Sequence, residues 1–255
     1  MRVIHSADPA EPDLAVDVSG CPTAGGPPVV LVHGMGGDHT TWHSTVRTLR
    51  ATCRATVAVD LRGHGRSGRA ADYRLDDFAA DLGRVVDELR LVRFDLVGHS
   101  LGAHTALRYA MDRPDRVRRL VLEEIPPMPR DEADLAEQIA PTATLGERIR
   151  GVGALLARPG PFLRFDRSLP DAVLRQFDVP EPEWWARLNT VPASALVISG
   201  GARSFLPGRH LQSLADALPR GRMVTIDAGH SVHRDRGPEF LSALVAHLDE
   251  PDGQD

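Results

Sequence analysis

Hydrophobic and polar positions recur along this chain with two different periods, which predict two kinds of element. Residues 29–32 are four apolar residues in succession, as in a strand covered on both faces of a parallel sheet. From residue 75 to 89, apolar residues return every three or four positions and predict one face of a helix. Further strands are expected at 55–59, 94–97, 117–122, 195–198 and 222–226, and further helices at 43–51, 103–110, 208–218 and 238–248. This alternation is typical of an α/β fold.

The N-terminal residues predict a different kind of strand. Residues 2–5 and 14–18 are short stretches in which apolar and polar side chains alternate. Such stretches, joined by a loop, predict an antiparallel hairpin, here at one edge of the sheet.

The pattern changes after the strand expected at 117–122. Three prolines, at 126, 127 and 129, forbid a continued strand, and the residues up to 189 lean toward short helices. Some 60 residues without a strand are too many for a loop in such a chain. We therefore expect a core of residues 1–125 and 190–255, interrupted by a helical cap of residues 126–189.

Composition narrows the class of protein. The chain has 255 residues, 42% hydrophobic and 25% charged, with a net charge of -5 and no basic cluster, so no nucleic-acid partner is expected. Two cysteines, Cys21 and Cys53, provide neither a metal cluster nor a disulfide framework, which favours a cytoplasmic location. No apolar stretch reaches the roughly 18 residues of a membrane span, and the acidic N-terminus does not resemble a signal peptide. A monomer or homodimer without membrane contact is expected.

The sequence Gly-His-Ser-Leu-Gly at 98–102 lies between the strand at 94–97 and the helix that follows. Strand, tight turn and helix form the context in which this motif is a nucleophile elbow. We expect Ser100 to adopt a strained conformation, with glycines beside it because the turn leaves no room for a Cβ atom. The alternative is a serine that only caps the helix, but three further motifs favour the elbow.

The first of these motifs is His33-Gly34-Met35-Gly36-Gly37, directly after the strand at 29–32. In elbow enzymes the oxyanion is bound by the N–H group after the nucleophile, here Leu101, and by one from this earlier loop, assigned to Met35. His33 and Gly34 are expected to contact the substrate, since glycine permits close approach to the backbone. A phosphate loop is excluded because no Gly-Lys-Ser/Thr follows.

A nucleophilic serine needs a base, and histidine suits neutral pH. His230 follows the last expected strand and comes after the serine, in the order of elbow enzymes. His233 is an alternative three residues further on. His64, in the glycine-rich loop at 60–67, is interpreted as a residue that satisfies buried backbone groups rather than as a base or metal ligand.

These motifs resemble those of the α/β-hydrolase fold superfamily. The matching stretches are 32–34, 60–67, 98–102 and 228–230, in the family's order. The resemblance implies an eight-stranded, mostly parallel sheet flanked by helices, with a helical cap inserted after the sixth strand. It also implies hydrolysis by a serine, a histidine and an acid, with neither a cofactor nor a metal.

The acid departs from the family pattern. The family usually places it in the loop after the seventh strand, but this loop, 199–207, contains no carboxylate. A minority of the family takes the acid from the end of the sixth strand, where this chain has Glu123 and Glu124. Strand alternation points the two side chains to opposite faces, and Glu124 is chosen to orient His230. Asp227 is a weaker alternative.

Aromatic residues gather in the expected cap, although they are only 5% of the chain. They could cover an apolar acyl or ring-bearing substrate, or they could form the cap's own core. Three of them, Phe162, Trp184 and Trp185, are proposed to bind substrate.

The sequence therefore predicts a serine hydrolase that cleaves a carboxylic ester, thioester or lactone of a small apolar acyl compound through an acyl-enzyme. A carbon–carbon bond hydrolase, a cofactor-free perhydrolase or an acyl-transferring cyclase could use the same three residues. A haloalkane dehalogenase is disfavoured, because position 100 is a serine and not a carboxylate. A non-catalytic ligand-binding protein remains an alternative, supported by the missing acid after the seventh strand.

Overall fold

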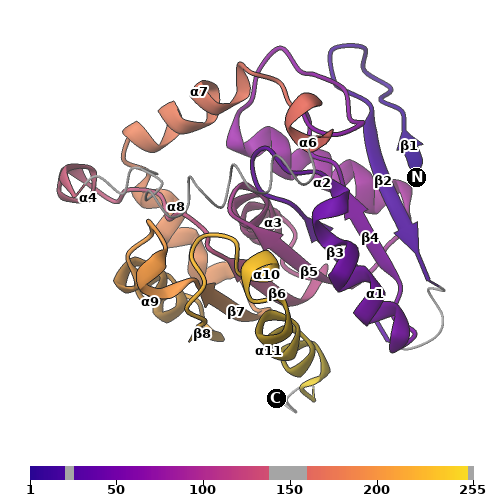
Figure 1. Cartoon of the computed structure of the whole chain (residues 1–255). Coiled ribbons are helices and arrows are strands. Elements are labelled where there is room, and N and C mark those ends of the chain that lie inside the picture. Colours follow the sequence, from indigo (N-terminus) through magenta and orange to yellow (C-terminus); the bar gives the residue numbers. More distant parts are fainter. Residues whose placement is uncertain (21–25, 138–159, 252–255) are drawn as a thin grey trace.

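A computed structural model describes residues 1–20, 26–137 and 160–251 (Figure 1). The described strands form one sheet of eight, in the order β1-β2-β4-β3-β5-β6-β7-β8. β2 pairs antiparallel with β1 and β4, and the remaining pairs are parallel. The strands are β1 Arg2–Ile4, β2 Leu14–Ser19, β3 Val29–Val32, β4 Thr56–Val59, β5 Phe94–His99, β6 Val117–Glu123, β7 Ser194–Ser199 and β8 Gly221–Thr225. The predicted mostly parallel α/β sheet with its antiparallel edge hairpin is confirmed.

The central strands are largely buried because helices cover the sheet on both faces. β3 and β4 are buried at every position. α2, α3 and α9 contribute to one hydrophobic core, and α1 and α11 contribute to the other. These helices are α1 His43–Ala51, α2 Leu75–Glu88, α3 Leu101–Asp112, α9 Gly208–Ala217 and α11 Gly237–Asp249.

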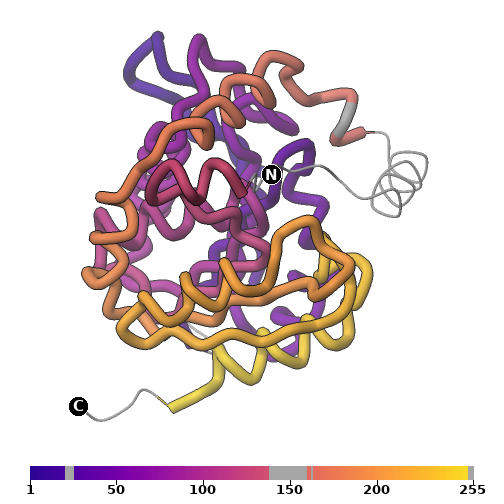
Figure 2. The backbone as a smooth tube through the Cα atoms, turned by 90° about the vertical axis from the view of Figure 1, so that its left-hand side faces the viewer, coloured from indigo at the N-terminus to yellow at the C-terminus, as the bar shows by residue number. Residues whose placement is uncertain are grey.

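Between β6 and β7 the described residues contain short helices and no strand. These are α4 Glu132–Ala136, α6 Gly160–Leu163, α7 Leu169–Leu174, η2 Arg175–Asp178, α8 Pro182–Ala186 and η3 Arg187–Thr190. Figure 2 shows the salmon-to-orange chain of this segment along the outside of the molecule. Gln176 joins it to the core, since its side chain accepts the N–H of Leu75 and donates to the carbonyl of Tyr73. The division into core and cap domains stays a prediction, and residues 138–159 lie outside the described residues.

Two differences from the sequence expectation concern elements next to Ser100 and His230. β5 continues through His99, two residues beyond the predicted end, because Gly98 and His99 still pair with Leu122 and Glu123 of β6. The helix α10, Val232–Asp235, was not predicted. A single helical turn carries too few residues to show a period.

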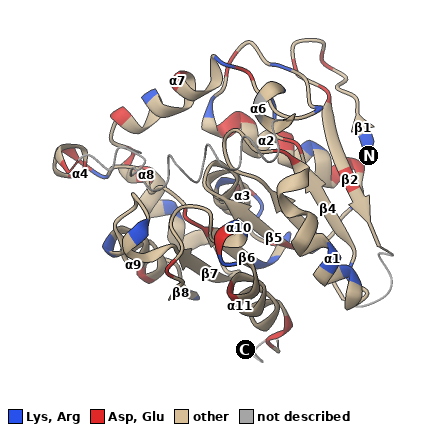
Figure 3. Cartoon of the chain, in the orientation of Figure 1, with Lys and Arg blue, Asp and Glu red and all other residues tan. Residues whose placement is uncertain are grey.

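Acidic and basic residues are interspersed along the described helices and strands (Figure 3). None of the helices in this part of the chain has both the length and the apolar character needed to cross a membrane.

Candidate active site

Ser100 sits at the bend between β5 and α3, in a backbone conformation that L-residues rarely adopt. Its φ is 51° and its ψ is -115°. The two flanking glycines make this bend possible. A Cβ atom at Gly98 would lie 2.3 Å from the carbonyl oxygen of Gly102, and one at Gly102 would lie 2.2 Å from that of Val32. The strand-to-helix turn therefore has the local geometry that a nucleophile elbow requires.

Three side chains from separate elements form a continuous hydrogen-bonded chain at this bend. The Ser100 hydroxyl lies 2.9 Å from His230 Nε2, and His230 Nδ1 lies 3.1 Å from Glu124 Oε2. The Glu124 carboxylate is fully buried, whereas 19% of the His230 side chain is exposed. A carboxylate that accepts from Nδ1–H leaves Nε2 free to accept the proton of the serine.

The loop after β7, which lacks a carboxylate, instead donates hydrogen bonds to Glu124. Gly200 N–H donates to Oε1 and the Ser204 hydroxyl donates to Oε2. Glu124 directly follows β6 and has a φ of 50°, and its own N–H donates to Ile198 of β7. Together with His230, these donors satisfy a buried charge that would otherwise be costly.

Gly200 also forms backbone hydrogen bonds with the loop that carries His230. Its carbonyl oxygen accepts the N–H groups of Ala228 and Gly229, at 3.0 and 2.9 Å. A Cβ atom at Gly200 would lie only 2.0 Å from the Gly229 carbonyl oxygen, so no other residue fits this contact. Asp227, the alternative acid, is exposed, and its Oδ2 lies 3.4 Å from Arg203 Nε.

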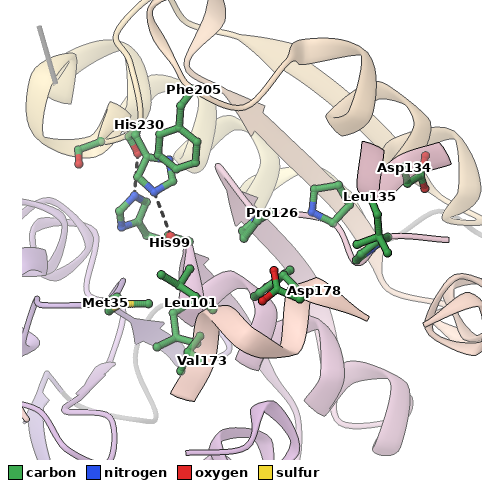
Figure 4. Close-up of a pocket in the computed structure, with 16 residues that line it drawn as sticks. Met35, His99, Leu101, Pro126, Asp134, Leu135, Val173, Asp178, Phe205 and His230 are labelled. Atoms are coloured by element: carbon green, nitrogen blue, oxygen red, sulfur yellow. Dashed lines mark hydrogen bonds between the residues drawn. The ribbon is translucent and has the colours of Figure 1, made fainter. Parts of the chain in front are cut away.

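The serine and histidine open into a cavity of about 880 Å³. Most of its lining is apolar, and Figure 4 shows Met35 near Leu101, the residue that follows Ser100. The described lining consists of Met35, His99, Ser100, Leu101, Pro126, Pro127, Pro129, Asp134, Leu135, Val173, Leu174, Phe177, Asp178, Phe205, His230 and Ser231. A volume of this size and character suits an apolar small molecule.

The two tryptophans that sequence analysis assigned to the substrate, Trp184 and Trp185, are not among the described residues that line this cavity. Trp184 is buried and stacks on His104, with ring centroids 5.3 Å apart. Trp185 is half-buried and its Nε1–H donates to the carbonyl of Met128, 2.7 Å away. Both belong to the packing of the segment between β6 and β7. The side chain of Phe162 lies outside the described part of the structure.

Phe205 was missed by sequence analysis. Its ring lies beside that of His230, with centroids 4.3 Å apart, and it lines the cavity. It belongs to the loop after β7, where an aromatic residue next to the expected acid position was the available signal. Phe177, also aromatic, reaches the cavity from η2.

His33 and Gly34 do not line the cavity either. His33 is fully buried, its Nδ1 lies 2.7 Å from the carbonyl oxygen of Gly34, and its Nε2 accepts the N–H of Leu61. Gly34 packs behind the elbow, where an added Cβ would lie 2.5 Å from His99 Nδ1. These two residues shape the loop that presents Met35.

His64 forms a hydrogen bond with the same loop. Its Nε2 accepts the N–H of Gly36 at 3.1 Å, and its Nδ1 lies 2.9 Å from the carbonyl oxygen of Arg62. Burial lowers the pKa of His64 to about 3, so the ring is neutral. The geometry agrees with the interpretation of His64 as a partner of buried backbone.

One group of side chains in the described residues has the spacing of metal ligands. His99, Glu123 and His233 each offer one ligand atom, and these atoms lie within 4.8 Å of one another. In this structure Glu123 already accepts a hydrogen bond from His233, at 2.7 Å. We refer to these three residues as the Glu123 cluster.

The sequence is similar to a known protein family and to several of its named members. Residues 27–154 match a family model described as alpha/beta hydrolase fold. The sn-1-specific diacylglycerol lipase ABHD11 of Danio rerio is 33% identical over 255 residues, which cover 87% of this chain and 78% of that protein. Its counterpart in Mus musculus is 27% identical and covers 87% and 81%.

Solved structures share the fold. A carboxylesterase from Nitrososphaera gargenis has a TM-score of 0.81 at 17% identity and covers 97% of both chains. A hydrolase from Pseudomonas aeruginosa has a TM-score of 0.77 at 24% identity and covers 97% of this chain and 98% of its own.

Proposed function

Since the chain belongs to the alpha/beta hydrolase family, we propose that it is a serine hydrolase that cleaves carboxylic esters of apolar acyl groups through an acyl-enzyme. The observation that carries this proposal is the hydrogen-bonded chain from Ser100 through His230 to Glu124 at an apolar cavity. Each of the three has the chemistry its position demands: nucleophile, base and orienting carboxylate.

In the first step the Ser100 hydroxyl attacks the carbonyl carbon of the ester while His230 Nε2 takes its proton. Glu124 holds the ring in the required tautomer and stabilises the imidazolium that forms. The negative charge on the former carbonyl oxygen is bound by the N–H groups of Met35 and Leu101. Leu101 is the first residue of α3, and N–H groups in the first turn of a helix have no partner within that helix.

Collapse of this intermediate breaks the carbon–oxygen bond to the leaving alcohol, which receives the proton from His230. The acyl group stays on Ser100 as an ester. A water molecule then gives a proton to His230 and attacks the acyl carbon, which releases the acid and returns the proton to the serine. The balance is one ester and one water consumed for one acid and one alcohol.

The apolar lining favours uncharged acyl chains over small polar ones. Relatives named as diacylglycerol lipases suggest glycerol esters as one class of substrate, with a hydroxyl group of the glycerol as the leaving group. Thioesters and lactones also place a carbonyl beside a good leaving group, and the fold neighbours include an enol-lactonase and a thioesterase. Esters are the first choice, and the other two classes belong in the same assay.

A non-catalytic role has less support. Its argument was the loop without a carboxylate after β7, but Glu124 lies 3.1 Å from His230 Nδ1 and leaves no gap at the position of the acid.

The test is a panel of p-nitrophenyl esters of increasing chain length, with a thioester, a lactone and a diacylglycerol, assayed with wild type and Ser100→Ala. We expect turnover of the longer esters by wild type and only background rates for Ser100→Ala. Ser231 lines the same cavity, and Ser231→Ala is the matched control that should keep turnover of the wild-type order. Equal rates for wild type and Ser100→Ala would reject the proposal.

A further inference from the structure

The Glu123 cluster is adjacent to the proposed catalytic residues and has no part in the reaction as described. Glu123 is the last residue of β6, and Glu124 follows it. His99 precedes Ser100, and His233 follows His230 by three positions. Each member of the cluster is thus a near neighbour in sequence of one proposed catalytic residue.

Glu123 and His233 form a tight buried pair. The carboxylate accepts the backbone N–H of His233 at 2.9 Å, and its Oε2 lies 2.7 Å from His233 Nδ1. Glu123 is fully buried and only 6% of the His233 side chain is exposed. Burial alone would raise the pKa of Glu123, but the electrostatic attraction and the hydrogen bonds of His233 lower it to about 2. Glu123 is therefore a carboxylate at neutral pH.

This pair fixes α10 against the end of the sheet. His233 lies in α10, which begins at Val232 two residues after His230. Its ring also packs on Trp42 of η1 (His39–Trp42), with centroids 4.7 Å apart. One end of the loop that carries His230 is thereby held by Glu123, and the other end is held by Gly200.

His99 adds a direct contact to His230. Its Nε2 lies 2.7 Å from the carbonyl oxygen of His230. Burial lowers the pKa of His99 to about 3, so the ring is neutral. Because a carbonyl oxygen can only accept, Nε2 carries the proton and donates it. The rings of His99 and His233 also meet edge to face at 4.9 Å.

The strand end ties these contacts to the nucleophile. Ser100 N–H donates to the carbonyl oxygen of Glu123 at 2.9 Å. Glu123 thus contacts the backbone of the elbow through its carbonyl oxygen, and it contacts the loop that carries His230 through its side chain. A displacement of this residue would change the separation of the two reacting groups.

We propose that Glu123, His233 and His99 are positioning residues, which hold the ring of His230 within hydrogen-bond reach of Ser100. This inference rests on the proposed serine hydrolase function and adds to it a second glutamate–histidine pair whose task is geometric. Misplacement of catalytic groups by about 1 Å can cost about 100-fold in rate, so the effect of losing the pair should fall on kcat.

The experiment measures kcat and KM per active site, with sites counted by a fluorophosphonate that labels Ser100. Glu123→Ala and His233→Ala should lower kcat by about 10- to 100-fold, with little change in KM. His233→Asn should recover most of the loss, since the amide N–H takes the place of Nδ1–H. Simple destabilisation would reduce the number of titrated sites but not kcat per site.

His247→Asn is the control. His247 is also fully buried, and its Nε2 lies 3.1 Å from the carbonyl of Ser194 at the opposite end of β7. It should lower the thermal midpoint and leave kcat per site unchanged. An unchanged kcat in Glu123→Ala and His233→Ala, with wild type active and labelled, would overturn the positioning role alone. Absence of labelling and turnover in wild type would instead reject the proposed function.

A metal would be a different explanation for the same three residues. If treatment of wild type with a chelator abolished turnover, and one equivalent of Zn²⁺ restored it in wild type but not in Glu123→Ala, the cluster would be a metal site. That result would overturn the positioning role. We expect turnover to be insensitive to the chelator.

Discussion

At the scale of single residues, the proposed triad takes its carboxylate from an unusual place, the end of β6. Glu124 leaves β6 with a left-handed backbone conformation and reaches across to the loop after β7. Gly200 and Ser204 there donate to it, where the family usually has the acid itself. The carboxylate therefore lies beside the loop after β7, although it comes from the end of β6.

Glu124→Gln tests this assignment. The amide keeps the shape of the carboxylate but can neither stabilise the imidazolium nor enforce the tautomer of His230. We expect kcat to fall by about three to four orders of magnitude, as for other acids of such triads, measured on the best ester of the panel. Asp227→Asn is the matched control and should retain wild-type turnover. An unaffected Glu124→Gln, with Asp227→Asn inactive, would move the acid to Asp227.

The donors to Glu124 allow a graded version of the same test. Ser204→Ala removes one hydrogen bond to the carboxylate and leaves the carboxylate in place. A hydrogen bond to a charged group is worth about 1.5–3 kcal/mol. We expect its loss to lower the free energy of unfolding or kcat, and any fall in kcat to be well short of the fall in Glu124→Gln. Urea unfolding and steady-state kinetics on the same preparation separate the two. A fall in kcat as large as that of Glu124→Gln would contradict the role of Ser204 as a donor that only supports the carboxylate.

At the scale of elements, the strand-to-helix bend depends on contacts that exclude side chains. α3 crosses so close to β3 that the Gly102 position has no space for a methyl group. The sequence shows this dependence as a pair of glycines around a serine, and the bend could therefore be predicted without coordinates.

Gly102→Ala measures the closeness of this packing. A Cβ atom there would lie 2.2 Å from the Val32 carbonyl oxygen, and overpacking of this kind costs about 1–3 kcal/mol. We expect urea unfolding to show that loss, together with reduced turnover. Gly83→Ala in the middle of α2 is the control, because its Cβ would meet only Tyr109, at 3.8 Å. It should raise stability by about 0.5–1 kcal/mol. A neutral Gly102→Ala would show that the bend is looser than described.

At the scale of the whole molecule, several buried histidines make stability depend on acid. Burial lowers the pKa of His64 and His99 to about 3 and that of His247 to about 4. The unfolded chain binds these protons near pH 6.5, whereas the folded chain does not until the pH is much lower. Stability from these groups is therefore fully present above about pH 6.5 and falls as the pH decreases toward 4 and 3.

Each such histidine contributes a slope of about 1.4 kcal/mol per pH unit below its unfolded pKa. His247→Gln should reduce the slope of unfolding free energy between pH 6 and pH 5 by about that amount. Urea unfolding at several pH values measures it. Wild type unfolded in parallel at each pH gives the reference slope. An identical slope in His247→Gln would mean that its ring is not held neutral by burial.

The limits of sequence reasoning also appear at this scale. Apolar periodicity predicted the strands and long helices, and the glutamate pair at the end of a buried strand indicated where an acid could come from. The aromatic residues of the segment between β6 and β7 could not be assigned from sequence, because core packing and ligand contact require the same residue types. Trp184 packs inward, whereas Phe205, which lines the cavity, lies outside that segment.

The Glu123 cluster illustrates a second limit. Glu123 and His233 are 110 positions apart, and His233 was considered only as an alternative base. Their pairing depends on the register of β6 and on the unpredicted turn of α10. Long-range pairs of this kind become visible only once strand ends are aligned.

The most direct test of the account is to observe the acyl group on Ser100. Wild-type protein is quenched during turnover of a p-nitrophenyl ester, digested and analysed by tandem mass spectrometry. We expect the peptide that contains residues 98–102 to carry the mass of the acyl group at Ser100. The same adduct should be absent from His230→Ala quenched under the same conditions. An acyl group on a different residue, or ester turnover by Ser100→Ala at the wild-type rate, would contradict the central claim.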